Sequence, residues 1–352
     1  MGLKELPVYT LLLAFILIYN YLIIQIYKST NQIKALDDIG INPSLPVIYI
    51  ITPTVNNLAQ RAHLTRMAYT LALVPNVMWI VVEDADEPSP KVLRVLTNSW
   101  HPYVHLWIHK EYKNKHHKGC AQRNLGLAWL RNLFGVGQLS TLSTNSYLKS
   151  ETMNDFQASR PSYAQLASKF ENKYHKSINP FNFKNSKFLT NTASWRDNWS
   201  NKNGIVYFAD DDNTYDIEIF YQMRQIKKVG VWPVAFSGGL NVERPLVIKG
   251  KVTGWLVAYV KQRPMATDMA GFAINLALVL QNADVYFHES YKNNWLESNF
   301  LSKFVDLQDL EPLANNCTQV LVWHTKTRHP NLDLESKFIK RFNAPSNQNM
   351  EI

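Results

Sequence analysis

The stretch Gly204–Asn213 reads GIVYFADDDN, an apolar run that ends in three adjacent aspartates, Asp210–Asp212. The apolar part predicts a strand buried on both faces of a parallel sheet, and apolar residues at helical spacing follow the aspartates. Adjacent carboxylates repel one another, so a site that keeps them ionised should supply a cation. Hard divalent ions such as magnesium or manganese prefer carboxylate oxygens and commonly bridge a protein to a diphosphate. The alternative is an acidic loop that only caps the following helix.

Two earlier apolar runs extend this pattern towards the N-terminus. Residues 46–51 and 77–82 are nearly continuous apolar segments, and residues 59–73 between them have helical spacing. A strand, a helix and a strand in this order predict a right-handed crossover in a parallel sheet. The second run ends in Glu83 and Asp84, at the edge where open α/β sheets bind ligands. We therefore expect an α/β domain with acidic strand ends.

A third strand and a further helix are expected before the acidic triplet. Apolar residues alternate over 104–108, which predicts a strand. This alternation argues against a metal site formed by His101, His105 and His109 at helical spacing, and favours solvated or packed imidazoles. Residues 120–133 have one apolar side and predict a helix.

Glycine-rich phosphate motifs are absent from the sequence. Neither a Walker pattern nor a GxGxxG is present, which argues against nucleoside triphosphatases and dinucleotide enzymes. The one close glycine pair, Gly238 and Gly239, follows a predicted strand at 231–236. It suggests a close approach of the backbone to another group, and an ordinary turn explains it equally well.

The composition indicates a folded chain with a large core. The 352 residues are 46% hydrophobic and 12% aromatic and include only two cysteines, which excludes a disulfide-stapled mini-protein, a collagen and a wholly disordered chain. Lysine and arginine outnumber aspartate and glutamate by 37 to 28, but they form no dense basic run. We therefore expect no nucleic-acid partner and a surface compatible with anionic ligands. Cys120 and Cys317 are expected to be unpaired thiols.

The N-terminal segment predicts a membrane anchor. Residues 8–27 are mostly apolar and carry no charge, and a helix of about 20 such residues spans a bilayer. We predict a cytoplasmic tail at 1–7, a transmembrane signal-anchor helix at 8–27 and a stem at 28–45. The flanking charges give no clear orientation, and a buried core helix is the alternative. Glycosylation sequons begin at Asn198 and Asn316 and would matter only if the bulk of the chain were lumenal.

Seven segments, in the family's order, resemble glycosyltransferase family 43, the inverting glucuronyltransferases of the Golgi with a GT-A fold. The segments are Ile51–Thr54, Val82–Ala85, Gln122–Asn124, Tyr207–Tyr215, Asp268–Phe272, Leu296–Ser298 and Val320–Thr325. The resemblance implies a GT-A catalytic domain at 46–345, with a Rossmann-like mixed sheet and an acidic metal motif. Its donor-binding half would occupy 46–230 and its acceptor-binding half 231–345, followed by a tail at 346–352.

The resemblance also implies an activity. The implied enzyme moves glucuronic acid from UDP-glucuronate to the 3-hydroxyl of a terminal β-galactose, with manganese (Mn²⁺) as cofactor. The acceptor would be a galactose-terminated glycan on a protein core. Both the proteoglycan linkage region and N-acetyllactosamine on glycoproteins fit, and the sequence does not separate them. The implied location is the Golgi membrane, single-pass type II with a lumenal catalytic domain, and the resemblance suggests a homodimer. The alternative class is a catalytically silent, membrane-anchored, lectin-like homologue.

Positions that match the family's motifs imply the donor site. Asp212 resembles the metal ligand, Asp211 the ribose contact and Asp84 the uracil contact. The implied donor-binding residues are Asp84, Lys118, Arg123, Asp210, Asp211, His324 and Lys326. His324 would lie near the diphosphate, where cationic side chains and a metal offset the charge that develops on the UDP leaving group.

Glu297 occupies the position of the family's catalytic base. An inverting displacement needs one carboxylate to deprotonate the acceptor hydroxyl on the side opposite the leaving group. A glutamate near a helix start is usually a cap or a solvated residue, but the matching motif around Glu297 favours the base. Glu243, Arg263 and Asp268 match residues that hold the acceptor sugars, whose hydroxyls donate hydrogen bonds to carboxylates.

Four features depart from the family pattern. Val55 stands where the family commonly has a tyrosine that stacks on uracil, so that contact is lost or supplied by another residue. Lys118 and Lys326 stand where arginines are usual, and lysine keeps the charge without the bidentate fork, so weaker donor binding is expected. Residues 135–203 form a longer connection than in relatives. We interpret it as a partly disordered surface insertion, with acceptor or partner binding as the alternative.

Overall fold

The computed structural model describes residues 45–99, 101–108, 119–136, 203–258, 263–288, 295–325 and 332–348. The predicted cytoplasmic tail, the signal-anchor helix and all of the stem except residue 45 lie outside these ranges, as do Lys118, Asn198, Lys326 and nearly all of the insertion. None of the helices in the described ranges has the length and apolar character that a bilayer crossing requires. The predicted domain boundaries and the predicted anchor stay predictions.

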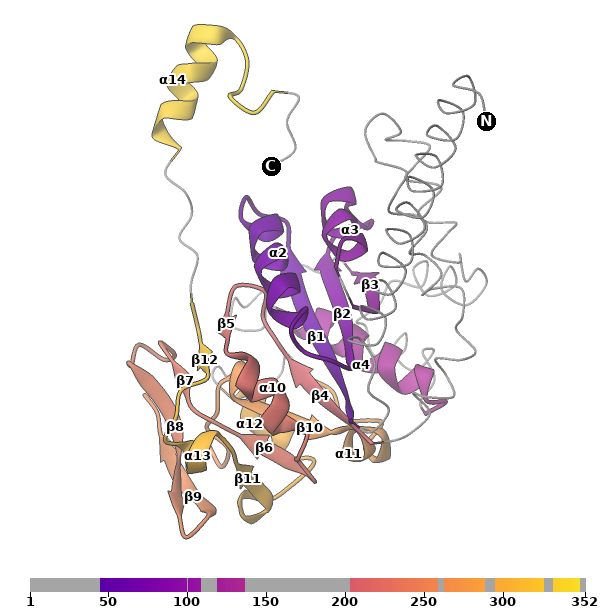
Figure 1. Cartoon of the computed structure of the whole chain (residues 1–352), viewed down its shortest axis with the longest axis vertical. Helices are drawn as coiled ribbons and strands as arrows, with labels where there is room; N and C mark the ends of the chain where they lie inside the picture. The colour runs from indigo at the N-terminus through magenta and orange to yellow at the C-terminus, as the bar shows by residue number, and fades with distance from the viewer. Residues whose placement is uncertain are drawn as a thin grey trace, which may run out of the picture. The chain divides into compact units, whose positions relative to one another are not determined.

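A seven-stranded mixed sheet forms the framework of the described residues (Figure 1). In spatial order its strands are β11 (Leu310–Pro312), β6 (Val229–Val231), β10 (Phe272–Asn275), β4 (Gly204–Phe208), β1 (Val47–Val55), β2 (Val77–Asp84) and β3 (Tyr103–Trp107). Strands β4, β1, β2 and β3 run parallel, whereas β10 is antiparallel to β4 and β6. The strands predicted at 46–51, 77–82, 104–108 and before the acidic triplet are confirmed, and so is the α/β class.

Strand β1 is buried on both faces, which explains its continuous apolar sequence. Tyr49 and Ile51 belong to one hydrophobic core and Ile48 and Ile50 to the other, and all four side chains are fully buried. Complete burial of such a side chain contributes about 1.5–3 kcal/mol relative to exposure. The strand is therefore a rigid base for the groups at its carboxyl end.

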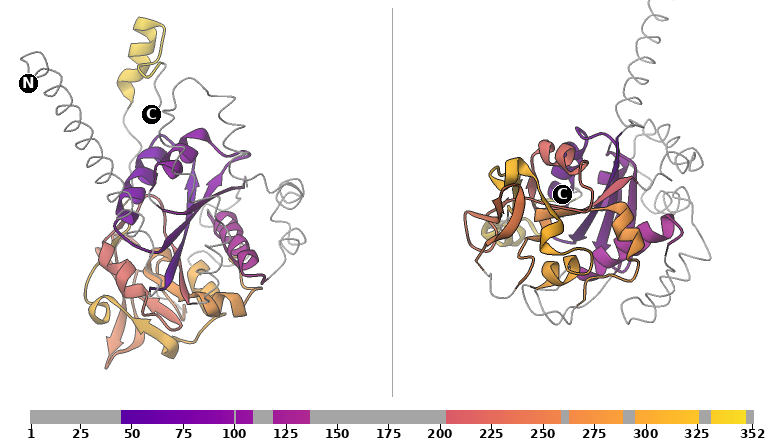
Figure 2. Two further views of the ribbon diagram at one scale, coloured as in Figure 1. Left: turned by 45° about the vertical axis from the view of Figure 1, so that its right-hand side comes forward. Right: turned by 90° about the horizontal axis from the view of Figure 1, so that it is seen from below.

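Helices cover both faces of this sheet (Figure 2). On one face lie α2 (Gln60–Leu71), α3 (Pro90–Thr97) and α10 (Ile217–Met223), and on the other α4 (Cys120–Leu133), α11 (Leu276–Gln281) and α12 (Leu296–Leu301). Leu64 of α2 shares a core with Phe220 of α10, and Leu127 of α4 shares the other core with Phe300 of α12. The helix predicted at 120–133 is α4, with the same bounds.

A second sheet has five strands and lies beside the carboxyl end of β4. Its strands, in spatial order, are β5 (Thr214–Tyr215), β12 (Val322–Trp323), β7 (Val234–Ala235), β8 (Val242–Ile248) and β9 (Lys251–Leu256). The single strand predicted at 231–236 is wrong, because the chain leaves β6 of the first sheet and enters β7 of the second. Between them Pro233 lacks a ladder donor, and the buried Trp232 indole Nε1 donates to the Ala270 carbonyl at 2.9 Å. These two residues mark the change of sheet.

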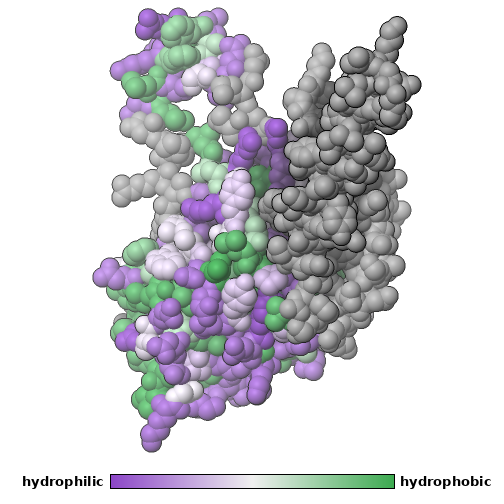
Figure 3. All heavy atoms as spheres, in the orientation of Figure 1, coloured by the Kyte–Doolittle hydropathy of each residue, from purple (hydrophilic) through white to green (hydrophobic). Residues whose placement is uncertain are grey.

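The remaining short elements and the surface complete the described chain. They are η3 (Met269–Gly271), η4 (Leu307–Asp309), α13 (Ala314–Cys317) and α14 (Asp333–Phe342). Cys120 and Cys317 are both buried and neither forms a disulfide, as predicted. Asn316 of α13 is exposed, which leaves its glycosylation a prediction. Apolar side chains also reach the surface of the β8–β9 hairpin, where Ile248 is 62% exposed, and Figure 3 shows apolar and hydrophilic side chains mixed there.

Candidate active site

The acidic triplet follows β4 and lies beside the carboxyl end of β1. Thr54 Oγ1 at the end of β1 donates to Asp211 Oδ2 at 2.6 Å, and Gln60 Nε2 donates to Thr54 Oγ1 at 3.2 Å. This chain of hydrogen bonds fixes the Asp211 carboxyl to strand β1 and to the first residue of helix α2. Burial raises the pKa of Asp211 to about 7, and the two neighbouring aspartates add to the shift. A cation bound nearby would favour the ionised form.

Asp210 is paired with Arg123, which comes from the first turn of α4. Arg123 Nη2 lies 2.5 Å from Asp210 Oδ1, and the arginine side chain is only 7% exposed. Burial alone would lower the pKa of Arg123, but the Asp210 carboxylate outweighs it and the pKa is raised. Gly119 precedes α4 with a φ of +81°, and a Cβ there would meet Arg123 Nη1 at 2.5 Å. Glycine at position 119 therefore leaves room for the Arg123 guanidinium.

The backbone of Asp212 is held from two sides. Its carbonyl accepts a hydrogen bond from Arg66 Nη2 at 2.8 Å and another from Thr325 Oγ1 at 2.6 Å. Thr214 Oγ1 lies 3.2 Å from the same threonine hydroxyl. These contacts connect α2, β5 and the segment after β12 to the last aspartate of the triplet, so its position is fixed before any ligand binds.

The residues present fit a divalent metal that is held jointly with a ligand. Among the described residues, no group of three or more His, Cys, Asp or Glu side chains is arranged to hold a metal. Magnesium and manganese, however, are often bound through one or two carboxylates together with substrate phosphates and water. Burial, followed by Asp210, raises the pKa of Asp212, while His324 opposes the shift. A carboxylate in such surroundings gains from a bound cation.

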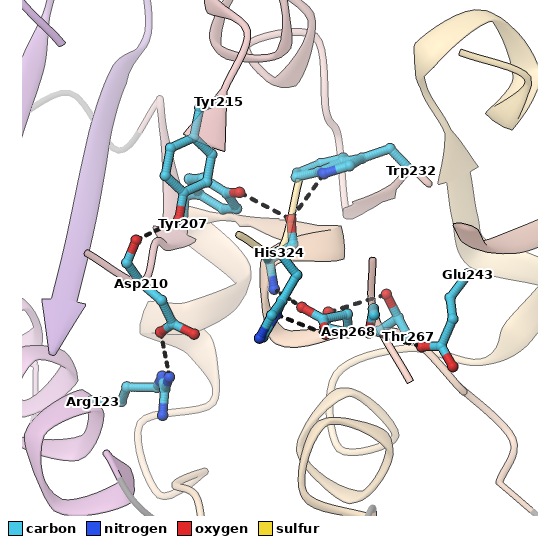
Figure 4. A network of polar contacts seen from close by, with 11 residues as sticks. Arg123, Tyr207, Asp210, Tyr215, Trp232, Glu243, Thr267, Asp268 and His324 are labelled. Atoms are coloured by element: carbon cyan, nitrogen blue, oxygen red, sulfur yellow. Dashed lines mark hydrogen bonds and ion pairs between the residues drawn. The ribbon is translucent and has the colours of Figure 1, made fainter. Parts of the chain in front are cut away.

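His324 and Asp268 form an ion pair beside the triplet (Figure 4). His324 Nδ1 lies 3.6 Å from Asp268 Oδ2, a distance that is too long for a hydrogen bond. The Asp268 carboxylate nevertheless raises the pKa of His324, and Asp210 and Asp212 add to the effect. Burial would raise the pKa of Asp268, but His324 and the Ala270 N–H outweigh it and the pKa is lowered. These carboxylates therefore favour the protonated form of the His324 imidazole.

Glu243 lies on the far side of Asp268, on strand β8. Its Oε1 accepts the Ala258 backbone N–H at 3.0 Å, and its Oε2 accepts Ser237 Oγ–H at 3.0 Å. The same serine hydroxyl lies 2.7 Å from Asp268 Oδ2. Two of the predicted acceptor carboxylates are thus joined through one hydroxyl, and Figure 4 shows them on one side of His324.

Glu297 is the second residue of α12 and its side chain is half-buried. Burial raises its pKa to about 7, and Asp268 adds to the shift, whereas Arg123 and Arg263 oppose it. The predicted base therefore lies within electrostatic reach of one predicted donor residue and two predicted acceptor residues. A carboxyl whose pKa lies near neutrality is suited to general base catalysis.

Asp84 ends β2, where it pairs in register with Val55 of β1. Val55 is 51% exposed, so the edge beside Asp84 has no aromatic side chain at this position. The preceding Glu83 is fully buried, and its Oε2 lies 3.0 Å from His105 Nε2 and accepts the Ser89 N–H at 3.0 Å. His105 is packed against Glu83 and His101 is also buried, which agrees with the prediction of a strand with solvated or packed imidazoles. His109 lies outside the described residues.

A shell of aromatic hydroxyl and indole groups supports the site (Figure 4). Tyr207 Oη and Trp232 Nε1 each donate to the Ala270 carbonyl at 2.9 Å. Tyr215 Oη donates to the Asp210 carbonyl at 2.8 Å. The backbone after β4 and the backbone of η3 are therefore both fixed by buried donors.

The structure brings most of the predicted residues to one region. They are Arg123, Asp210, Asp211, Asp212, Glu243, Arg263, Asp268, Glu297 and His324. Asp84 lies at the neighbouring strand end, and Lys118 and Lys326 lie outside the described residues. Thr54 and Ser237 are not among the site residues predicted from the sequence. The only signals for them were the ITPT segment that contains Thr54 and the glycine pair that follows Ser237.

The sequence profile of glycosyltransferase family 43 matches residues 67–146 and 144–328, which is more than half of the chain. The chain belongs to glycosyltransferase family 43. This family 43 protein is therefore an enzyme that transfers a glycosyl group.

Curated relatives of this family 43 enzyme include human galactosylgalactosylxylosylprotein 3-beta-glucuronosyltransferase 1, which is 39% identical over 86% of this chain and 75% of its own length. Galactosylgalactosylxylosylprotein 3-beta-glucuronosyltransferase 2 of Canis lupus familiaris is 36% identical over 84% of this chain and 72% of its own length. Among solved structures, that of S. aureus TarS residues 1–349 matches with a TM-score of 0.39 and 12% identity, and the match covers 79% of this chain and 60% of that chain. The last likeness is too weak to carry any functional conclusion.

Proposed function

We propose that the chain is an inverting glucuronyltransferase with a GT-A fold that moves glucuronic acid from UDP-glucuronate to the 3-hydroxyl of a terminal β-galactose. The observation that carries the proposal is the position of Glu297, which lies within electrostatic range of Arg123 on the donor side and of Asp268 and Arg263 on the acceptor side. A base for glycosyl transfer must reach both substrates at once. The names of the curated relatives, 3-beta-glucuronosyltransferases, support transfer of the same sugar and formation of the same bond.

The proposed reaction is a single displacement. The Glu297 carboxylate takes the proton of the acceptor hydroxyl, and the freed oxygen forms a bond to the anomeric carbon of the glucuronate. The bond from that carbon to the diphosphate oxygen breaks on the opposite side, and UDP leaves with the electron pair. The configuration at the anomeric carbon therefore inverts, and no covalent sugar–enzyme bond forms.

Arg123 and His324 are suited to stabilise the leaving group. Arg123 is cationic and almost fully buried, and the pKa of His324 is raised by Asp268, which favours the imidazolium. Fixed positive charges beside a developing phosphate charge lower the barrier because they need no reorganisation during the reaction. Asp212 would hold a divalent ion, for which manganese is proposed, and this ion would neutralise part of the diphosphate charge when bound.

We propose that the acceptor is the galactose-galactose-xylose stub of the proteoglycan linkage region on a protein core. Two curated relatives carry the words galactosylgalactosylxylosylprotein in their names, which supports this acceptor over N-acetyllactosamine. The proposed location is the Golgi membrane, in a single-pass type II orientation with residues 8–27 as the anchor and the catalytic domain in the lumen.

The test uses the full-length chain in detergent-solubilised membranes, with UDP-glucuronate and manganese. Galactosyl-galactosyl-xylose and N-acetyllactosamine are offered separately, and products are analysed for a β1,3-linked glucuronate. Transfer to the first acceptor supports the full proposal, and transfer to the second alone overturns the proposed acceptor. No transfer to either, with UDP still bound, favours the lectin-like alternative. If microscopy located the tagged chain outside the Golgi, the proposed location would be contradicted.

A further inference from the structure

The turn between β7 and β8 has an unusual backbone for its sequence. Phe236 has a φ of +63°, in the left-handed region that a bulky side chain disfavours, and it is followed by Ser237 and by Gly238 with a φ of +60°. The Phe236 N–H donates to the Asn241 carbonyl at 2.9 Å, which closes the turn. A strained residue that persists in a folded protein is held there by its surroundings, and such residues cluster at functional sites.

The turn places Ser237 between two carboxylates. Ser237 is 6% exposed, and its Oγ lies 2.7 Å from Asp268 Oδ2 and 3.0 Å from Glu243 Oε2. The other oxygen of each carboxylate accepts a backbone hydrogen bond, from Ala270 N–H at 2.9 Å and from Ala258 N–H at 3.0 Å. Each carboxylate therefore uses one oxygen to fix its position and turns the other towards the serine.

The absence of a side chain at Gly238 allows the Glu243 carboxylate to lie close to the turn. A Cβ at position 238 would lie 2.1 Å from Glu243 Oε1, which is far inside contact distance. The glycine thus permits both the left-handed backbone and the close approach of the carboxylate. The sequence suggested such an approach from the glycine pair alone, and the structure identifies the approaching group as Glu243.

One serine hydroxyl, with one hydrogen to donate, faces two carboxylate oxygens within hydrogen-bond distance. Asp268 Oδ2 also faces His324 Nδ1 in the ion pair at 3.6 Å, whereas the Ser237 hydroxyl is the group that faces Glu243 Oε2. When the serine donates to Asp268, a second hydroxyl placed against Glu243 would supply a hydrogen to Glu243 Oε2. Sugar hydroxyls are donors of this kind.

We propose that Ser237 is a positioning residue for acceptor binding. Its hydroxyl holds Glu243 and Asp268 at a fixed separation and leaves one carboxylate oxygen to accept a hydrogen bond from a hydroxyl of the acceptor sugar. The inference rests on the proposed function and adds to it a residue that acts on the acceptor through two carboxylates. Ser237 does not touch the reacting atoms. It contributes to the binding of a polyhydroxylated acceptor and to selectivity between acceptors whose hydroxyls are arranged differently.

The variant Ser237→Ala removes the hydroxyl and little else. The lost hydrogen bonds join Ser237 to two carboxylates, and loss of a hydrogen bond to a charged group changes an equilibrium constant by about tenfold or more. We expect the KM for the galactose acceptor to rise about tenfold, with kcat and the KM for UDP-glucuronate within about twofold of the wild type. Ser237→Thr keeps the hydroxyl and should retain acceptor binding better than Ser237→Val, which has the same shape without it. Ser336→Ala, at an exposed position of α14, is the control.

A mutant cycle tests whether Ser237 acts through the carboxylate. The full-length chain carries Ser237→Ala, Glu243→Gln or both, and the acceptor KM is measured for each. We expect the acceptor KM of the double variant to rise less than the product of the two single increases, because both substitutions remove the same contact. Three results would overturn the inference while the wild type still transfers glucuronate. They are equal changes in the donor and acceptor KM of Ser237→Ala, an acceptor KM in the double variant that equals the product of the single effects, and Ser237→Thr and Ser237→Val variants with the same acceptor KM. A wild type that transfers nothing would overturn the proposed function, and this inference with it.

Discussion

The rate of glucuronyl transfer should rise with pH along a limb set by Glu297. Burial raises the pKa of this carboxyl from the ordinary 4.5 to about 7. A carboxyl with that pKa is roughly 10% ionised near pH 6, about 50% near pH 7 and about 90% near pH 8. We therefore expect kcat/KM for the acceptor to rise about fivefold from near pH 6 to near pH 7, and less than about twofold over the next unit. An unshifted glutamate would give a nearly flat profile over this range.

The assay measures initial rates of transfer with limiting acceptor at saturating UDP-glucuronate and manganese. Burial also raises the pKa of Asp211 to about 7, so this residue is a second source of such a limb. In Asp211→Asn, the limb set by Glu297 should persist although donor binding is weaker. A flat wild-type profile, or a limb that disappears in Asp211→Asn, would refute the assignment of the limb to Glu297.

Three further predictions concern the surrounding groups. Gly238→Ala should lower the free energy of unfolding by about 2 kcal/mol more than Gly250→Ala, because both positions have positive φ but only the first Cβ meets Glu243; equal urea midpoints would contradict this. Asp212→Asn should weaken manganese-dependent UDP binding about tenfold or more in calorimetry, and an unchanged metal dependence would count against its role. The raised pKa of Asp211 means that the folded chain holds a proton there that the unfolded chain releases near pH 4. The stabilisation from this bound proton is therefore fully present below about pH 4 and is lost as the pH rises to about 7. Thermal melts of the metal-free wild type should lose more stability between about pH 4 and about pH 7 than melts of Asp211→Asn.

The sequence predicts the first sheet well because its signals are local. The continuous apolar runs at 46–51 and 77–82 reflect burial on two faces, which a short window of residues records. The helix at 120–133 has the predicted bounds, but it is buried around most of its circumference and not on one side only, and Leu133 at its end is exposed. Carboxylates at the end of β4 follow from the same pattern. The second sheet was not predicted, because its strands β5, β7 and β12 have two residues each and carry no periodicity.

The candidate site could be predicted only in part. Asp210 and its two neighbours stand out as adjacent charges after an apolar strand, but their partners are distant along the chain. Arg123 is 87 residues from Asp210, and the resemblance to a family, not spacing, indicated that both belong to one site. Ser237 lies 31 residues from Asp268, and their contact depends on how the β7–β8 turn packs against η3. No local pattern records such packing.

The most direct test of the proposed mechanism is the turnover of Glu297→Gln compared with its UDP binding in the same preparation. The substitution keeps the shape of the side chain and removes the group that takes the acceptor proton, and loss of a general base lowers rates by about 100- to 10,000-fold. Glu218→Gln, at an exposed position of α10, is the control and should be fully active. We expect Glu297→Gln to bind UDP within about twofold of the wild type and to lose turnover by at least about 100-fold. Turnover close to the wild type would contradict the assignment of Glu297 as the base.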